Sequence, residues 1–270
     1  MWKKKTIGTA LACALALGAW SGSALATPVT VGGITWDPAD GADLNIQAFN
    51  FRESSVAGVG DKLTGYGEIG QINGDSDFCS GCSLTFTFEY TLSAIEGDAL
   101  NPKVIFDNGS INFFVDAGGT FDVADPTTAG IGTAWLALSG HTAPFTGFTG
   151  LGQLYSNING AVSAPGALSG GFGLLDVTGG PASVWMDTNS RADGADFDLS
   201  SAFSTQPYKQ CESVSADPTD ICHYPILGTG TLTGQSLAVP EPGTIGMLGL
   251  GLGFLGLALR RRRKESDDLA

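Results

Sequence analysis

Basic residues are scarce in this 270-residue chain, which has 13 Lys and Arg against 27 Asp and Glu, and only two His. Eight of the 13 lie near the ends, in Lys3–Lys5 and Arg260–Lys264. Residues 27–239 therefore contain five Lys and Arg against 23 Asp and Glu, a balance of −18. Proteins that bind nucleic acid present a basic face to the phosphates, so this composition excludes that class. A stretch this acidic attracts divalent cations instead.

Catalytic signatures are also missing from the chain. It has no G-x-S-x-G, H-E-x-x-H or P-loop pattern, and its two histidines, His141 and His223, are far apart in sequence. A glycosidase needs a pair of carboxylates, and nothing singles out such a pair among the acidic residues. We therefore expect a protein that is not an enzyme, with a secreted hydrolase as the alternative.

Long apolar runs occur only at the two ends, which excludes a membrane protein with several spans. Lys3–Lys5 precede a mostly apolar run over 7–20, and Ala24 and Ala26 form a small-x-small cleavage pattern. Residues 1–26 are therefore predicted to be a signal peptide, handled by the Sec machinery and signal peptidase. The alternative is an N-terminal membrane anchor, but the run is short for a span and ends in the cleavage pattern.

The C-terminal end combines a short motif, an apolar run and a basic cluster. The motif is Pro240, Glu241 and Pro242, and 17 uncharged residues follow it over 243–259. The cluster consists of Arg260, Arg261, Arg262, Arg263 and Lys264. Seventeen residues are the lower limit for a transmembrane helix, and the positive-inside rule keeps such a cluster cytoplasmic. We therefore expect one transmembrane helix over 243–259 and a cytoplasmic tail over 265–270.

This order of parts over residues 238–264 resembles the PEP-CTERM sorting signal of Gram-negative bacteria. The resemblance implies that a membrane protease of the exosortase type cuts near the Pro-Glu-Pro. The body, after transient anchoring in the membrane, would then reach the cell surface or the extracellular matrix. The resemblance also implies a link to exopolysaccharide, biofilm or floc, and hence a non-enzymatic structural or adhesive role. It covers only the last 30 or so residues.

Residues 27–237 are typical of short strands separated by turns, and their apolar content excludes a wholly disordered chain. Over 84–92, large apolar residues alternate with Thr and Glu, which predicts a strand with one buried face. Asn108-Gly109 lies between two apolar runs and predicts a hairpin turn. Weaker strand patterns cover 44–48, 104–106, 111–115, 120–123, 133–138, 172–177, 183–186 and 228–232. Residues 139–170 fit a long loop or two weak strands. We predict one all-β exported domain, a β-sandwich or jelly roll.

Four cysteines remain once Cys13 leaves with the signal peptide. An even number in an exported chain predicts two disulfides, for which three pairings exist. We favour the local pairs Cys79–Cys82 and Cys211–Cys222. The alternatives are a zinc site made by the four thiolates, with His223 as a further ligand, and a redox-active C-x-x-C.

Two acidic groups are candidate Ca²⁺ sites, because alternate oxygen side chains in a glycine-rich turn can converge on this ion. The first group is Asn73, Asp75 and Asp77, and the second is Asp187, Asn189, Asp193, Asp196 and Asp198. Neither completes a twelve-residue calcium loop, and Asp and Asn are also ordinary turn formers. We expect no other cofactor.

Aromatic side chains offer a second kind of binding surface. The candidates for a sugar-stacking platform are Trp36, Trp135, Trp185, Tyr66 and Tyr155. Such rings also fill the cores of β domains, and the apolar runs around Trp135 and Trp185 favour that role. A polysaccharide-binding module, with or without Ca²⁺, is therefore a further alternative function.

Overall fold

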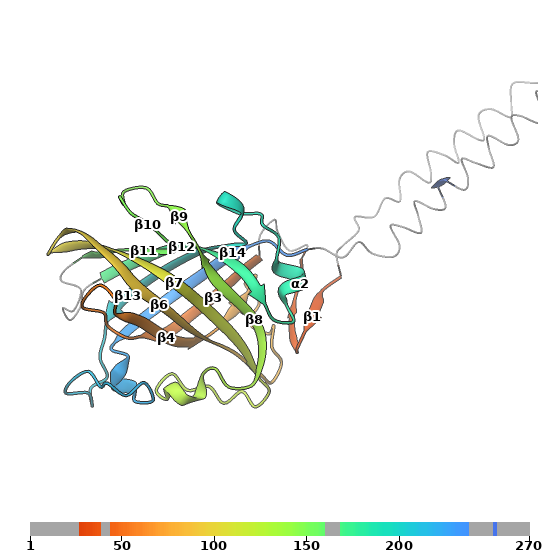
Figure 1. The fold of residues 1–270 in the computed structure, drawn as a ribbon. Helices are drawn as coiled ribbons and strands as arrows, with labels where there is room; N and C mark the ends of the chain where they lie inside the picture. The colour runs from red at the N-terminus through yellow and green to blue at the C-terminus, as the bar shows by residue number, and fades with distance from the viewer. Residues whose placement is uncertain (1–26, 39–43, 160–167, 238–250, 253–270) are drawn as a thin grey trace, which may run out of the picture. The chain divides into compact units, whose positions relative to one another are not determined.

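Antiparallel strands dominate the computed structural model, which describes residues 27–38, 44–159, 168–237 and 251–252 (Figure 1). The main sheet contains β3 (Leu44–Glu53), β4 (Lys62–Glu68), β5 (Gln71–Ile72), β6 (Ser83–Asp98), β7 (Asn101–Asp116), β8 (Thr133–His141), β11 (Leu154–Asn159), β12 (Leu168–Gly179), β13 (Phe197–Thr205) and β14 (Ile226–Gly234). Two small hairpins are β1 (Val29–Val31) with β2 (Ile34–Trp36) and β9 (Ala143–Pro144) with β10 (Leu151–Gly152). The short helices are η1 (Pro126–Thr128), α2 (Ser183–Met186), η2 (Ala192–Gly194) and η3 (Ile221–His223).

The main sheet closes on itself. β3, β4, β6, β7 and β8 pair in that order, β11 to β14 pair in sequence order, and β14 pairs with β3. The short β5 lies off this path and pairs with β3. β8 and β11 share one place between β7 and β12, since β11 pairs with Lys103–Phe106 of β7 and β8 pairs with Ser110–Val115. The result is a barrel-like sheet with eight strand positions. The all-β prediction is confirmed, whereas the sandwich or jelly roll is wrong because hydrogen bonding continues round a single sheet.

The predicted turn at Asn108-Gly109 is also wrong. Both residues lie inside β7, which pairs with β6 over its whole length in one long hairpin that turns between Asp98 and Asn101. Asn108 has a φ of 52°, and the register of the hairpin shifts nearby, so the Asn-Gly marks a β-bulge. Gly109 is required there because a Cβ atom would overlap the ring of Tyr90. Thus the glycine makes room for an aromatic ring and does not end the strand.

Apolar side chains fill the interior of the closed sheet. In β6, Leu84, Phe86, Tyr90 and Leu92 are buried, as the alternation over 84–92 predicts. Thr85, on the opposite face, is buried as well, and its Oγ1 accepts a hydrogen bond from the backbone N–H of Gly130. Part of the outer face of the sheet is therefore covered by the segment between β7 and β8.

Two of the predicted strands, over 120–123 and 183–186, are absent. Residues 183–186 form α2, and residues 120–123 belong to the irregular segment that precedes η1. Conversely, β9, β10 and β11 all fall within residues 139–170, which fitted a loop or weak strands. Four residues are too few for a periodicity that distinguishes a helix from a strand, which explains the error over α2, where Met186 is buried and Val184 is exposed.

Residues Pro28–Leu237 form one compact unit. The other unit comprises residues 1–27 and 238–270. The predicted transmembrane helix over 243–259 lies outside the described residues, except for Gly251 and Leu252, which are helical. No helix within the described ranges is long and apolar enough to cross a membrane.

Candidate functional site

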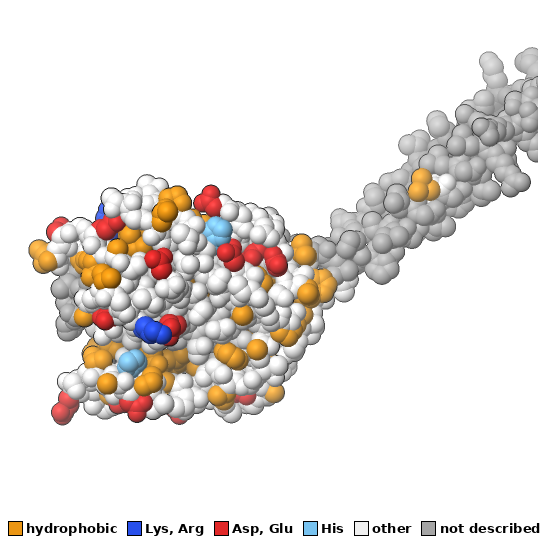
Figure 2. Space-filling model, in the orientation of Figure 1, with side chains coloured by type: hydrophobic (Ala, Val, Ile, Leu, Met, Phe, Trp, Pro, Cys, Tyr) orange, Lys and Arg blue, Asp and Glu red, His pale blue; other side chains and the backbone are white. Residues whose placement is uncertain are grey.

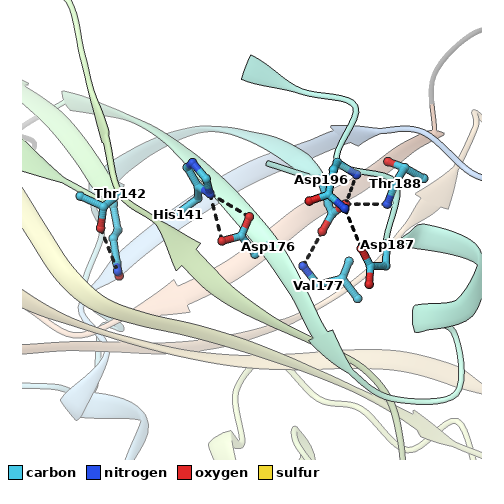
Figure 3. A network of polar contacts seen from close by, with 9 residues as sticks. His141, Thr142, Asp176, Val177, Asp187, Thr188 and Asp196 are labelled. Atoms are coloured by element: carbon cyan, nitrogen blue, oxygen red, sulfur yellow. Dashed lines mark hydrogen bonds and ion pairs between the residues drawn. The ribbon is translucent and has the colours of Figure 1, made fainter. Parts of the chain in front are cut away.

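The histidines do not form a catalytic centre together. His141 at the end of β8 points toward Asp176 on the neighbouring β12, with Nδ1 2.9 Å from Oδ1 (Figure 3). Among the described residues, the Asp176 carboxylate is the hydrogen-bond partner of the His141 ring. His223 lies in η3, where its Nδ1 is 2.8 Å from the carbonyl oxygen of Ser215. The absence of enzymatic activity stays a prediction.

The second acidic group is organised around Asp196, which is buried. Its carboxylate accepts hydrogen bonds from the backbone N–H groups of Val177 (2.7 Å), Thr188 (2.6 Å) and Asn189 (2.6 Å) (Figure 3). Asp196 therefore ties the loop after α2 to β12, and its oxygens face backbone donors. Asp187 is linked to this network because its Oδ1 accepts from Asn189 Nδ2, whereas Asp198 pairs with Arg191, whose Nε lies 3.2 Å from its Oδ2.

The first acidic group forms turns. Asn73 Oδ1 accepts from the backbone N–H of Asn45, and Asp75 Oδ1 accepts from that of Asp77. No cluster of three or more His, Cys, Asp or Glu suited to a metal ion occurs among the described residues. Calcium binding at either group stays a prediction that these contacts do not favour.

The cysteines are joined as predicted, Cys79 to Cys82 and Cys211 to Cys222. The first disulfide lies directly before β6, and the second closes the segment between β13 and β14. The cysteines are therefore used as covalent links in the structure, and no free thiolates are left for the zinc alternative. The redox alternative stays untested, because a redox-active C-x-x-C is also a disulfide when oxidised.

Most of the candidate platform rings lie in the core, the role that their apolar surroundings favoured. Trp36, Trp135, Tyr66 and Tyr155 are each at most 3% exposed, and Trp185 is partly buried. Trp36 packs edge-on against Trp135, and Tyr66 packs edge-on against Tyr224. The four buried rings pack against other parts of the domain and are not available to stack on a sugar.

The interior contains a polar site that sequence reasoning missed. Glu53 on β3, Tyr90 on β6 and Ser156 on β11 are all within 4% exposure and line one cavity of about 70 Å³. Within the part of the chain that the structure describes, Tyr90 Oη, Ser156 Oγ and the Glu53 carboxyl have no hydrogen-bond partner. Burial raises the pKa of Glu53 from 4.5 to about 8 and also raises the pKa of Tyr90.

The position of Glu53 was hidden by a bulge. The inward residues of β3 are Leu44, Ile46 and Ala48, after which the register with β14 shifts between Gly228 and Gly230. Beyond the shift the inward positions are Phe51 and Glu53. The inward residues of β3 are therefore even-numbered before the bulge and odd-numbered after it. Phe51 two residues before Glu53 was the only sequence signal that this carboxyl faces the interior.

The sorting and processing residues lie outside the described ones. These are Pro240, Glu241, Pro242, Arg260 to Lys264, and Ala24 and Ala26 of the signal-peptide cleavage pattern. Residues 238–263 match the PEP-CTERM protein-sorting motif, which confirms the resemblance at this end. No curated protein and no solved structure matches the chain. The motif supports an exported protein that is sorted at the membrane and processed by an exosortase.

Proposed function

We propose that residues 28–237 are a non-enzymatic structural or adhesive component of the cell surface or extracellular matrix. A transmembrane span over 243–259 holds the chain at the membrane until an exosortase-type protease cuts near Pro240-Glu241-Pro242. The observation that carries this proposal is the sorting motif at residues 238–263, which begins directly after the compact unit ends at Leu237.

The last residues of the compact unit are anchored to it. The backbone N–H of Leu237 donates to the carbonyl oxygen of Trp185 at 2.8 Å, and Trp36 Nε1 donates to Ser236 Oγ at 2.8 Å. A cut near the Pro-Glu-Pro therefore removes no residue of the closed sheet. The released body would keep its fold, as a matrix component requires.

The body also has features that suit a long life outside the cell. A closed sheet leaves few unpaired strand edges, which limits aggregation, and disulfides persist in oxidising compartments. Acidic side chains are scattered over the visible face and basic ones are few (Figure 2). An acidic body repels an acidic polysaccharide unless divalent cations lie between them. Binding of such a polymer through bridging Ca²⁺ is therefore the second candidate function.

Fractionation of cells that express the chain or its Glu241→Ala variant tests the sorting step. We expect the unaltered chain in the surface fraction or the medium and the variant in the membrane. Glu212→Ala, which removes a carboxylate from the body instead, is the control and should behave like the unaltered chain. Identical distributions of the unaltered chain and Glu241→Ala would contradict the proposal.

Retention on matrix polysaccharide tests the role that follows sorting. Retention without release of sugar products is expected for a structural or adhesive protein. Loss of retention in EDTA would select the calcium-bridged form, and turnover of a glycan or ester substrate would instead identify a hydrolase.

A further inference from the structure

Three unpartnered oxygen-bearing side chains face the same cavity inside the closed sheet. They are Glu53, Tyr90 and Ser156, from three different strands. A second cavity of about 40 Å³ adjoins the first, and Glu53 and Ser156 line both. Burying a polar group without a hydrogen-bond partner destabilises the folded state, so three such groups at one place indicate that a ligand or water completes their hydrogen bonds.

The rest of the lining is mainly apolar and aromatic. Phe51, Phe86, Phe88 and Phe106 contribute to the walls of the larger cavity. Among the described residues that line it, Glu53 and Tyr90 are the titratable ones. None of the described residues that line either cavity is a Lys or Arg. The neighbouring Arg52 is engaged elsewhere, because its guanidinium donates to the carbonyl oxygen of Gln206 and stacks on Tyr208. The interior therefore offers oxygen acceptors and ring faces but no counter-ion for Glu53.

These features select a cation with an apolar body. A primary ammonium has three N–H donors, and Glu53, Tyr90 and Ser156 supply three oxygens that can accept them. Aromatic walls favour a cation over an anion. The excess of acidic over basic residues in 27–239 likewise draws cations and repels carboxylates and phosphates.

We infer that the interior of the closed sheet binds a small primary amine, with its ammonium group at Glu53, Tyr90 and Ser156 and its alkyl part among the phenylalanine rings. A Leu/Ile/Phe-lined cavity of about 150 Å³ accommodates benzene. The two adjoining cavities, about 70 and about 40 Å³, therefore suit a molecule of roughly four or five non-hydrogen atoms. This binding is independent of the sorting step proposed above.

Binding of an amine is coupled to the proton on Glu53. Below a pKa of about 8 this carboxyl is protonated, so an incoming ammonium must displace one proton to form the ion pair. An alkylammonium resembles the Lys side chain and stays charged below about pH 10. The affinity for an amine should therefore rise roughly tenfold per pH unit up to about pH 8, whereas the affinity for a neutral ligand should not.

Calorimetry and thermal denaturation of the full chain with n-butylamine, 1-butanol and butyrate test the inference. We expect n-butylamine to bind and to raise the melting temperature, more strongly at pH 8 than at pH 6. Glu53→Gln should weaken this binding by at least about tenfold, and Ser156→Ala should weaken it roughly three- to tenfold without a change of charge. Glu89→Gln, which removes a surface carboxylate paired with Lys62, is the control and should bind like the unaltered chain.

The other outcomes overturn the inference. Equal binding of n-butylamine and 1-butanol, with no dependence on pH, would identify a site for neutral molecules. Tighter binding of butyrate would reverse the assigned charge. No binding of any probe by a folded chain would mean that water alone satisfies the three side chains. Normal binding by Ser156→Ala and Glu53→Gln would place the ligand elsewhere.

Discussion

At the residue scale, the ionisation of Glu53 makes the stability of the closed sheet depend on pH. Burial raises its pKa from 4.5 to about 8, so the folded chain holds a proton that the unfolded chain releases above about pH 4.5. The stability that this proton contributes is complete below pH 4.5 and is lost as the pH rises through about 8. The Glu53 carboxyl thus lowers the free energy of unfolding as the pH approaches about 8.

Glu53→Gln should remove this effect, because glutamine keeps the shape of the side chain and does not ionise. The free energy of unfolding of the unaltered chain should fall by a few kcal/mol between about pH 5 and 8, and that of the variant should fall much less. Urea denaturation at several pH values measures both slopes, with Glu89→Gln as the exposed control. Parallel slopes for the unaltered chain and Glu53→Gln would show that Glu53 does not titrate in this range.

Gly109 should tolerate no side chain. A Cβ atom there would overlap the ring of the buried Tyr90, so we expect Gly109→Ala to lower the free energy of unfolding by about 1–3 kcal/mol. Gly58, which has open space around it, is the matched control, and Gly58→Ala should be neutral or slightly stabilising. Equal effects in chemical denaturation would contradict this account of the interior.

At the element scale, the Cys211–Cys222 disulfide restrains the segment between β13 and β14. The two cysteines are 11 residues apart, and the segment also holds Tyr208 against the guanidinium of Arg52 at 4.2 Å. The closed loop restricts the unfolded chain, which is the usual source of stabilisation by a disulfide. This segment should therefore respond to loss of its disulfide more than the short turn at Cys79–Cys82 does.

A double Cys211→Ser, Cys222→Ser variant should lose about 2–3 kcal/mol of stability. Limited proteolysis should also cut it within residues 206–225 faster than the unaltered chain. Cys79→Ser with Cys82→Ser, where the cysteines are only three residues apart, is the comparison and should lose less. A larger loss in the Cys79 and Cys82 variant would reverse this order.

The type of an element was predictable where apolar and polar residues alternate over a long strand with one buried face, as over 84–92. It was not predictable at Asn108-Gly109, because the same dipeptide serves a hairpin turn or a bulge and only the position of Tyr90 distinguishes them. The Asp and Asn residues near 187–198 show the same limit. Their spacing fits a calcium site, yet Asp196 uses its oxygens on the backbone of a loop whose path is set by tertiary contacts.

At the scale of the whole molecule, closure of the sheet was beyond sequence reasoning. A sandwich and a closed sheet share the same alternation along each strand. They differ in pairs such as Glu53 with Ile226 and Tyr155 with Ile105, which are far apart in the chain. The sorting motif, in contrast, was readable because its parts are contiguous in sequence and confirmed over 238–263. The sorting signal of the protein was therefore predictable from the sequence, whereas the polar site inside the closed sheet was not.

The C-terminus of the mature protein tests the central claim most directly. Terminal peptides from membrane, surface and medium fractions can be mapped by mass spectrometry. We expect a body in the surface fraction or the medium that ends near Pro240-Glu241-Pro242 and retains Leu237. A chain found only in the membrane, with Arg260 to Lys264 still attached, would contradict it.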